Sequence, residues 1–108
     1  MKILHLDNSN FGEAILNNEV LLIDFYADWC GPCQALHPVL EKVAAQMAGK
    51  ASVAKVNVDN SSELAGEFGV RSIPALFFVK KGKIVAKAVG MQNEQNLIHK
   101  LNEIITNG

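Results

Sequence analysis

Both cysteines of the chain lie in one short segment, WCGPC at residues 29–33. Two cysteines separated by two residues can form a reversible disulfide, supply half of a metal site, or remain as inert buried thiols. A structural zinc site needs four ligands, but there is no second CxxC, and His5, His37 and His99 lack finger-type spacing. The pattern therefore favours redox chemistry, and the preferred prediction is a site without metal. Metal binding and inert thiols remain as the two less favoured alternatives.

The composition is that of one ordinary globular domain covering residues 1–108, with 49% hydrophobic and 19% charged residues. A net charge of −1 provides no basic field for nucleic acid or anionic membranes. His5 and Asp7 interrupt the only apolar run near the N-terminus, which is too short for a signal peptide or a membrane span. We therefore expect a cytoplasmic protein, and in that compartment a purely structural disulfide would not persist.

Strand and helix patterns alternate along the chain. Residues 20–27, VLLIDFYA, are apolar almost throughout, as in a strand covered on both faces. Lys81-Gly82 is a two-residue loop of the kind that joins antiparallel strands. The predicted strands are 2–6, 20–27, 52–58, 74–80 and 83–89, and the predicted helices are 9–18, 32–47, 61–68 and a last one from about residue 93.

These elements predict an α/β fold in the order β-α-β-α-β-α-β-β-α. Strands separated by helices are expected to run parallel, with right-handed crossovers, and the closing hairpin adds antiparallel strands. The predicted architecture is a mixed central β-sheet with helices on both faces.

The cysteine pair falls where a buried strand passes into a helix. Pro32 suits the first turn of that helix, where amide donors are unsatisfied in any case. Unpaired amides and the helix dipole favour a thiolate at the position of Cys30. Cys33 follows one turn later, on the same side and more buried. We therefore predict that Cys30 is the exposed, attacking thiol and that Cys33 resolves a mixed disulfide.

Three separated segments resemble the thioredoxin family. Residues 24–44, DFYADWCGPCQALHPVLEKVA, resemble the family's DFWAxWCGPCKxxxPxxE, and VAKVNVDN at 53–60 resembles its VAKxNxDxN. Residues 68–85, FGVRSIPALFFVKKGKIV, resemble YGIRSIPTLxxFKxGxxV, and a late glycine follows at position 90. Tyr26, Gln34 and Ala75 replace the usual Trp, Lys and Thr, and none of these changes removes a redox group. The resemblance covers nearly the whole length and implies the thioredoxin fold.

Asp24 lies within an apolar strand, where a carboxylate must be paired or kept neutral because burying its charge is costly. The resemblance implies that Asp24 is a buried acid that takes the proton of the resolving thiol through water. It also implies that Lys55 is the partner of Asp24. A strand-end hydrogen bond for Asp24 and an ordinary edge lysine at position 55 are the structural alternatives. His37 is expected to face solvent, without a role.

The family resemblance also implies a substrate surface around the sulfurs. It implies a cis bond between Ile73 and Pro74 that faces the disulfide, so that the Ile73 backbone can pair with an extended substrate segment. A plain turn proline is the alternative, since few X–Pro bonds are cis. The implied rim, shallow and mostly apolar, consists of Trp29, Gly31, Pro32, Ile73, Gly90 and Met91.

The function implied by the resemblance is reduction of protein disulfides by dithiol–disulfide exchange through Cys30 and Cys33. The expected partners are disulfide-containing client proteins and an NADPH-dependent flavoprotein, a thioredoxin reductase, so that the chain, acting as a monomer, binds no cofactor itself. A disulfide donor or isomerase of the same fold is the nearest alternative, but those proteins usually carry a histidine between the cysteines. A redox-independent binding module using the same groove is another.

Overall fold

The computed structural model describes residues 3–107, which form five strands and four helices in the predicted order. The strands are β1 (Leu4–Leu6), β2 (Val20–Tyr26), β3 (Ser52–Asn57), β4 (Ala75–Lys80) and β5 (Lys83–Val89). The helices are α1 (Phe11–Asn17), α2 (Gly31–Gln46), α3 (Ser62–Glu67) and α4 (Glu94–Thr106). Lys2, which the sequence assigns to the first strand, lies outside the described residues.

Helix α1 begins later than the sequence pattern predicts. The pattern predicts a helix from residue 9, but Asp7 organises a turn there instead. Its carboxylate accepts hydrogen bonds from the Ser9 and Asn10 amides at 2.8 and 3.3 Å. Short polar side chains compete with helical hydrogen bonds in this way, so the helix begins only at Phe11.

The five strands form one mixed sheet in the order β1-β3-β2-β4-β5. β1 and β2 pair parallel with β3, whereas β4 is antiparallel to β2 and β5 is antiparallel to β4. The expectation that helix-separated strands run parallel is therefore wrong for the connection through α3. That helix has six residues and spans only about 9 Å, too short to return along β3. The chain re-enters the sheet at the end where it left, which makes β4 antiparallel.

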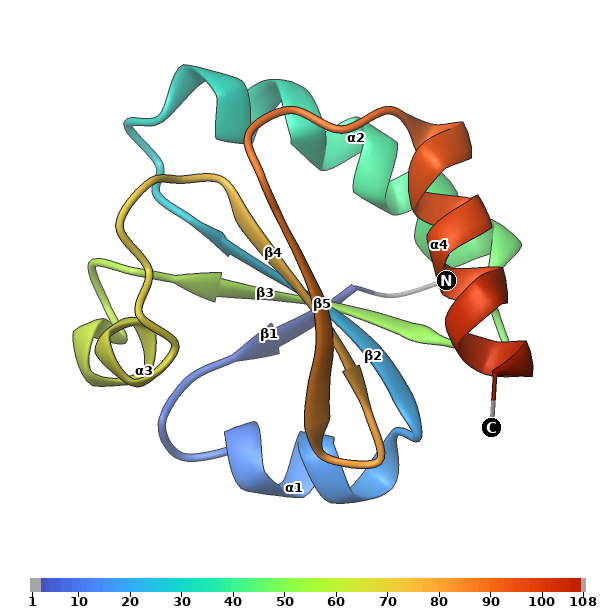
Figure 1. Cartoon of the computed structure of the whole chain (residues 1–108). Coiled ribbons are helices and arrows are strands. Elements are labelled where there is room, and N and C mark those ends of the chain that lie inside the picture. Colours follow the sequence, from blue (N-terminus) through green and yellow to red (C-terminus); the bar gives the residue numbers. More distant parts are fainter. Residues whose placement is uncertain (1–2, 108) are drawn as a thin grey trace.

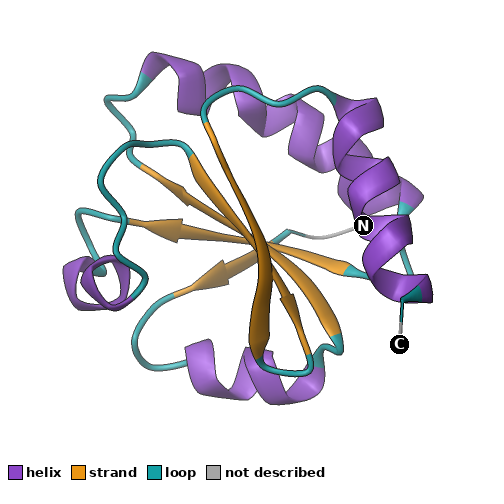
Figure 2. Ribbon diagram, viewed as in Figure 1, coloured by secondary structure: helices purple, strands orange, loops and turns teal. Residues whose placement is uncertain are grey.

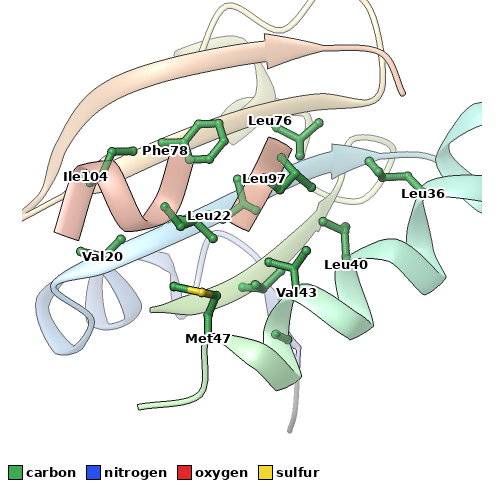
Figure 3. Packing of buried hydrophobic residues seen from close by; sticks show 13 residues of the cluster. Val20, Leu22, Leu36, Leu40, Val43, Met47, Leu76, Phe78, Leu97 and Ile104 are labelled. Atoms are coloured by element: carbon green, nitrogen blue, oxygen red, sulfur yellow. The ribbon is translucent and has the colours of Figure 1, made fainter. Parts of the chain in front are cut away.

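Helices cover both faces of the sheet, with α2 and α4 on one side and α1 and α3 on the other (Figures 1 and 2). Side chains alternate along β2 between the two layers. Val20 and Leu22 pack with α2 and α4, whereas Leu21 and Ile23 pack on the opposite face. Figure 3 shows Leu22 in the first layer, facing Leu40 and Val43 of α2. The nearly continuous apolar run of β2 reflects burial on both faces.

The predicted hairpin between β4 and β5 is confirmed. Lys81 and Gly82 both have positive φ values, 50° and 81°, as a two-residue turn of this handedness requires. Lys80 and Lys83 are paired across it.

The C-terminal end of β2, the start of α2 and the loop entering β4 meet at one end of the sheet. Figure 1 shows the turn into α2 beside the loop that leads from α3 to β4. The two cysteines lie at this junction.

Candidate active site

Cys30 and Cys33 are joined in a disulfide at the N-terminus of α2, with their Cα atoms 5.2 Å apart. Cys30 is the N-cap residue, and its Sγ accepts a hydrogen bond from the Cys33 amide at 3.2 Å. Pro32 lies in the first turn, as predicted. The Cys30 sulfur therefore sits where helix amides and the helix dipole stabilise negative charge.

Both cysteines are almost completely buried in this oxidised state. Cys30 is 5% exposed and Cys33 is 2% exposed, so the prediction that Cys30 is exposed is wrong here. The pair packs with Ala27 and Ile73, and the Cys30 Sγ lies 3.8 Å from the carbonyl oxygen of Ile73. These contacts cover the disulfide, and the contact with Ile73 comes from a loop distant in sequence.

The predicted cis peptide bond between Ile73 and Pro74 is confirmed. Pro74 is buried, and its carbonyl oxygen accepts a hydrogen bond from the Gly90 amide at 2.8 Å. Gly90 has a φ of 88°, a conformation that favours glycine. This bond ties the end of β5 to the loop over the disulfide, and it brings Gly90 and Met91 to the same end of the sheet.

Two large side chains at this end are exposed. Trp29 is 72% exposed and Met91 is 51% exposed, although transfer of large apolar side chains from water into the protein interior is favourable. Gly31 and Pro32 are also exposed, whereas Ile73 is half-buried. The residues predicted to form an apolar rim therefore lie at the cysteine end of the sheet.

Asp59 is part of this site and was not predicted. Its carboxylate accepts a hydrogen bond of 2.9 Å from the indole Nε1 of Trp29. Asp59 follows β3, and Trp29 follows the neighbouring parallel strand β2. Since parallel strands end at the same edge of a sheet, this placement was available as a signal once the strands were paired.

Asp24 is fully buried in the middle of β2, on the sheet face that α2 covers. Neither carboxyl oxygen has a hydrogen-bond partner among residues 3–107. Burial raises the pKa of the Asp24 carboxyl to about 7, and the Lys55 charge opposes that rise. A carboxyl with this pKa can gain or lose a proton near neutrality.

Lys55 is the neighbour of Asp24 across the β2–β3 ladder, but it does not pair with it directly. Within the described part of the chain no ion pair joins the two side chains, and Lys55 acts on Asp24 through its charge alone. The Lys55 ammonium instead contacts His37 Nδ1 at 2.9 Å and lies 4.1 Å from the centre of the Tyr26 ring. Burial lowers the pKa of Lys55, and the carboxylates of Asp24, Asp28 and Glu41 oppose that change.

His37 is the second residue whose surroundings differ from the prediction. It was expected to face solvent without a role, and its side chain is 39% exposed, but one of its ring nitrogens contacts Lys55. Its other ring nitrogen, Nε2, lies 3.5 Å from Glu41 Oε2. His37 follows Cys33 by four residues on α2, which places both on one side of the helix. That spacing was the signal available in the sequence.

Two further properties concern other site types. Among residues 3–107, no three His, Cys, Asp or Glu side chains cluster in a way that could hold a metal ion. In the same range, none of the helices is long and apolar enough to cross a membrane.

Comparisons with known proteins agree with this geometry. The family model described as Thioredoxin matches residues 2–103. The chain is 39% identical to a thioredoxin of Haemophilus influenzae over 96% of this chain and 98% of that protein. It is 44% identical to thioredoxin 2 of Chlorobaculum tepidum over 96% of each chain. The solved structure of a mutant thioredoxin from Halobacterium salinarum has a TM-score of 0.87 and 38% identity, covering 94% of this chain and 89% of that one. With a disulfide-bonded CxxC pair capping α2, the chain belongs to the thioredoxin family of thiol–disulfide oxidoreductases.

Proposed function

We propose that the chain works as a reductant of other proteins' disulfides, with Cys30 as the attacking thiol and Cys33 as the resolving thiol. One observation carries this assignment: the Cys30 sulfur is the N-cap of α2 and accepts the Cys33 amide hydrogen bond. The same donor would stabilise a Cys30 thiolate in the reduced protein. Cys33 lies one turn further into the helix and is buried.

The reaction then proceeds in two exchanges. The Cys30 thiolate attacks one sulfur of the client disulfide, a Cys30–client bond forms, and the other client sulfur leaves as a thiolate. The Cys33 thiol loses its proton and attacks Cys30 Sγ, forming the Cys30–Cys33 disulfide and releasing the second client sulfur as a thiolate. Two electrons pass from the dithiol to the client.

Asp24 is the proposed acceptor of the Cys33 proton. Its pKa of about 7 lets the carboxylate form at neutral pH while it remains basic enough to take a proton. Asp24 points to the sheet face covered by α2, whose buried side carries Cys33. A water molecule would carry the proton between the two groups. Lys55 modulates Asp24 by its charge and does not contact the reacting sulfurs in this proposal.

The client would bind over the partly exposed rim of Trp29, Gly31, Pro32, Ile73, Gly90 and Met91. The loop at Ile73 and Pro74 leads directly into β4, and the Ile73 carbonyl already lies beside Cys30 Sγ. An extended client segment aligned along this loop would bring its disulfide to Cys30, in the manner of an added strand.

The oxidised chain needs an external electron donor to turn over. An NADPH-dependent flavoprotein of the thioredoxin reductase type is the proposed donor, and the cytoplasm, where such thiols stay reduced, is the proposed location. We propose that the chain acts as a monomer with no bound cofactor.

Reduction of insulin disulfides by dithiothreitol, followed as turbidity, tests the assignment. Wild type should accelerate the reaction, whereas Cys30→Ser and Cys33→Ser should both fall to the uncatalysed rate. In a separate incubation with the client and without dithiothreitol, Cys33→Ser should retain a trapped mixed disulfide, and Cys30→Ser should not. Trapping by Cys30→Ser alone would reverse the roles, and acceleration by both single variants would exclude dithiol exchange.

A further inference from the structure

Two possible hydrogen-bond acceptors lie near the Lys55 ammonium, the Asp24 carboxyl and the His37 imidazole, and the ammonium bonds to His37. Asp24, directly across the β2–β3 ladder, offers two carboxyl oxygens that have no hydrogen-bond partner in the described chain. The Lys55 ammonium nevertheless contacts the imidazole of His37 at 2.9 Å. The Tyr26 ring, 4.1 Å from Nζ, supports the ammonium in that position.

The contact determines which ring nitrogen of His37 carries the proton. An ammonium group only donates hydrogen bonds, so His37 Nδ1 must be the unprotonated acceptor. The ring proton then sits on Nε2, the atom that faces Glu41 Oε2 at 3.5 Å. Glu41 therefore favours the tautomer that receives Lys55, and the three side chains form a row from Glu41 to His37 to Lys55.

We propose that His37 is a positioning residue that accepts a hydrogen bond from Lys55 and thereby holds the ammonium group off the Asp24 carboxyl. The inference deepens the proposed function, and its mechanistic part rests on the role proposed there for Asp24. Lys55 then influences Asp24 only through space. Without the acceptor on α2, the Asp24 carboxyl, which is the ladder neighbour of Lys55 and has no hydrogen-bond partner in the described chain, remains available to this ammonium.

Several charged or titratable groups face Lys55 from the elements packed around it. Asp24 comes from β2, Asp28 from the segment after β2, and Glu41 from α2, and all three carboxylates favour its charged form. His5 is its neighbour on β1 and lines the same cavity of about 260 Å³. None of these four groups lies within hydrogen-bond distance of Nζ, whereas His37 does.

A matched pair of variants isolates the acceptor from the shape of the side chain. His37→Leu and His37→Asn have the same branching, but only asparagine keeps an acceptor, Oδ1, near the place of Nδ1. His99→Leu is the control, because His99 faces Glu103 at 3.8 Å on α4 in a similar i,i+4 arrangement, and no lysine among residues 3–107 is hydrogen-bonded to its other ring nitrogen. His37 and His99 are both partly or largely exposed, so all three variants should fold.

The first readout is the titration of the Asp24 side-chain carboxyl by carbon NMR in the oxidised protein. In His37→Leu, Lys55 should turn to Asp24 and lower the titration midpoint by about one pH unit, since an adjacent opposite charge lowers a carboxyl pKa by roughly 1–3 units. His37→Asn and His99→Leu should stay within about 0.3 units of wild type. An unchanged or higher midpoint in His37→Leu would overturn the proposal, as would an equal fall in His37→Asn.

The second readout is the pH profile of insulin reduction by the same variants, and it separates this inference from the proposed function. If Asp24 accepts the Cys33 proton, the lower limb of the His37→Leu profile should move to lower pH together with the NMR midpoint. A moved NMR midpoint with an unmoved profile would support the placement of Lys55 by His37 and exclude the role proposed for Asp24.

Discussion

Replacing Asp24 with asparagine should stabilise the oxidised protein at pH 8, by an amount that shrinks towards pH 4. Asp24 is fully buried, and its carboxyl oxygens lack hydrogen-bond partners among residues 3–107. Burial raises its pKa from the ordinary 3.8 to about 7, despite the nearby Lys55 charge. Holding the ionised carboxylate in this position therefore works against folding.

The sign and size of this change in stability follow from the linkage between protonation and folding. In the unfolded chain Asp24 ionises near its ordinary pKa, whereas in the folded chain it holds its proton until about pH 7. Between these two values the folded state binds more protons, so raising the pH destabilises the fold. One pKa unit corresponds to about 1.4 kcal/mol, which gives a cost of about 4 kcal/mol once the pH exceeds the folded pKa. Asparagine carries no charge and avoids that cost.

Urea denaturation at pH 4, 6 and 8 measures the effect. The free energy of unfolding of Asp24→Asn minus that of wild type should rise across this range, by up to about 4 kcal/mol. The absolute gain will be smaller, because a buried amide without partners also costs free energy. The pH dependence is the sharper test, since that amide cost does not change with pH.

Asp7→Asn is a control whose effect on stability should have the opposite sign. Hydrogen bonds from the Ser9 side chain and the backbone amides of Ser9 and Asn10 lower the pKa of Asp7. A lowered pKa contributes stability above the unfolded pKa and loses it in acid, so Asp7→Asn should be destabilising at pH 8 and less so near pH 4. The reasoning would be refuted if Asp24→Asn gave the same difference from wild type at all three pH values, or a loss that grew with pH.

Three further predictions concern the cysteines and the backbone. In the reduced protein Cys30 should react with iodoacetamide much faster than Cys33, because it caps α2; peptide mass spectrometry decides this, and faster labelling of Cys33 would contradict the assignment. The dithiol should equilibrate with glutathione at a potential near about −270 mV, a figure taken from thioredoxin itself and not from this structure, and a value near about −120 mV would indicate an oxidant instead. Gly82→Ala should destabilise the fold by about 1 kcal/mol because Gly82 has a φ of 81°, whereas Gly66→Ala, in the open interior of α3, should stabilise it by about the same amount; thermal melts should show shifts of opposite sign.

The elements and the redox pair were predictable from local patterns. The apolar run of β2, interrupted only by Asp24, indicated a strand buried on both faces, and α2 could be predicted from its repeating apolar positions. Lys81-Gly82 specified the tight turn, because few residue pairs adopt positive φ at both positions. The place of Cys30 before a helix with Pro32 in its first turn followed from adjacent residues alone. Each of these features depends on neighbours within a few positions.

The larger errors concern residues brought together from distant parts of the chain. The direction of β4 depended on the short reach of α3 and not on the presence of a helix. The burial of Cys30 depended on the loop at Ile73, 43 positions away. The cis bond at Pro74 came from the family resemblance, since the residue types alone favour the trans form.

The environment of Asp24 shows most clearly which features follow from the local sequence and which depend on tertiary packing. That its charge would be costly followed from the apolar strand around it, and its burial is complete. That Lys55 bonds to His37 depended on the way α2 crosses β2 and β3, which places an imidazole within 2.9 Å of the ammonium. A lysine side chain is long and flexible enough to reach several acceptors, so its choice depends on their relative positions in space. The apolar strand around Asp24 is a local feature that already implies burial of its carboxyl, whereas the packing of separate elements determines which of the buried groups meet.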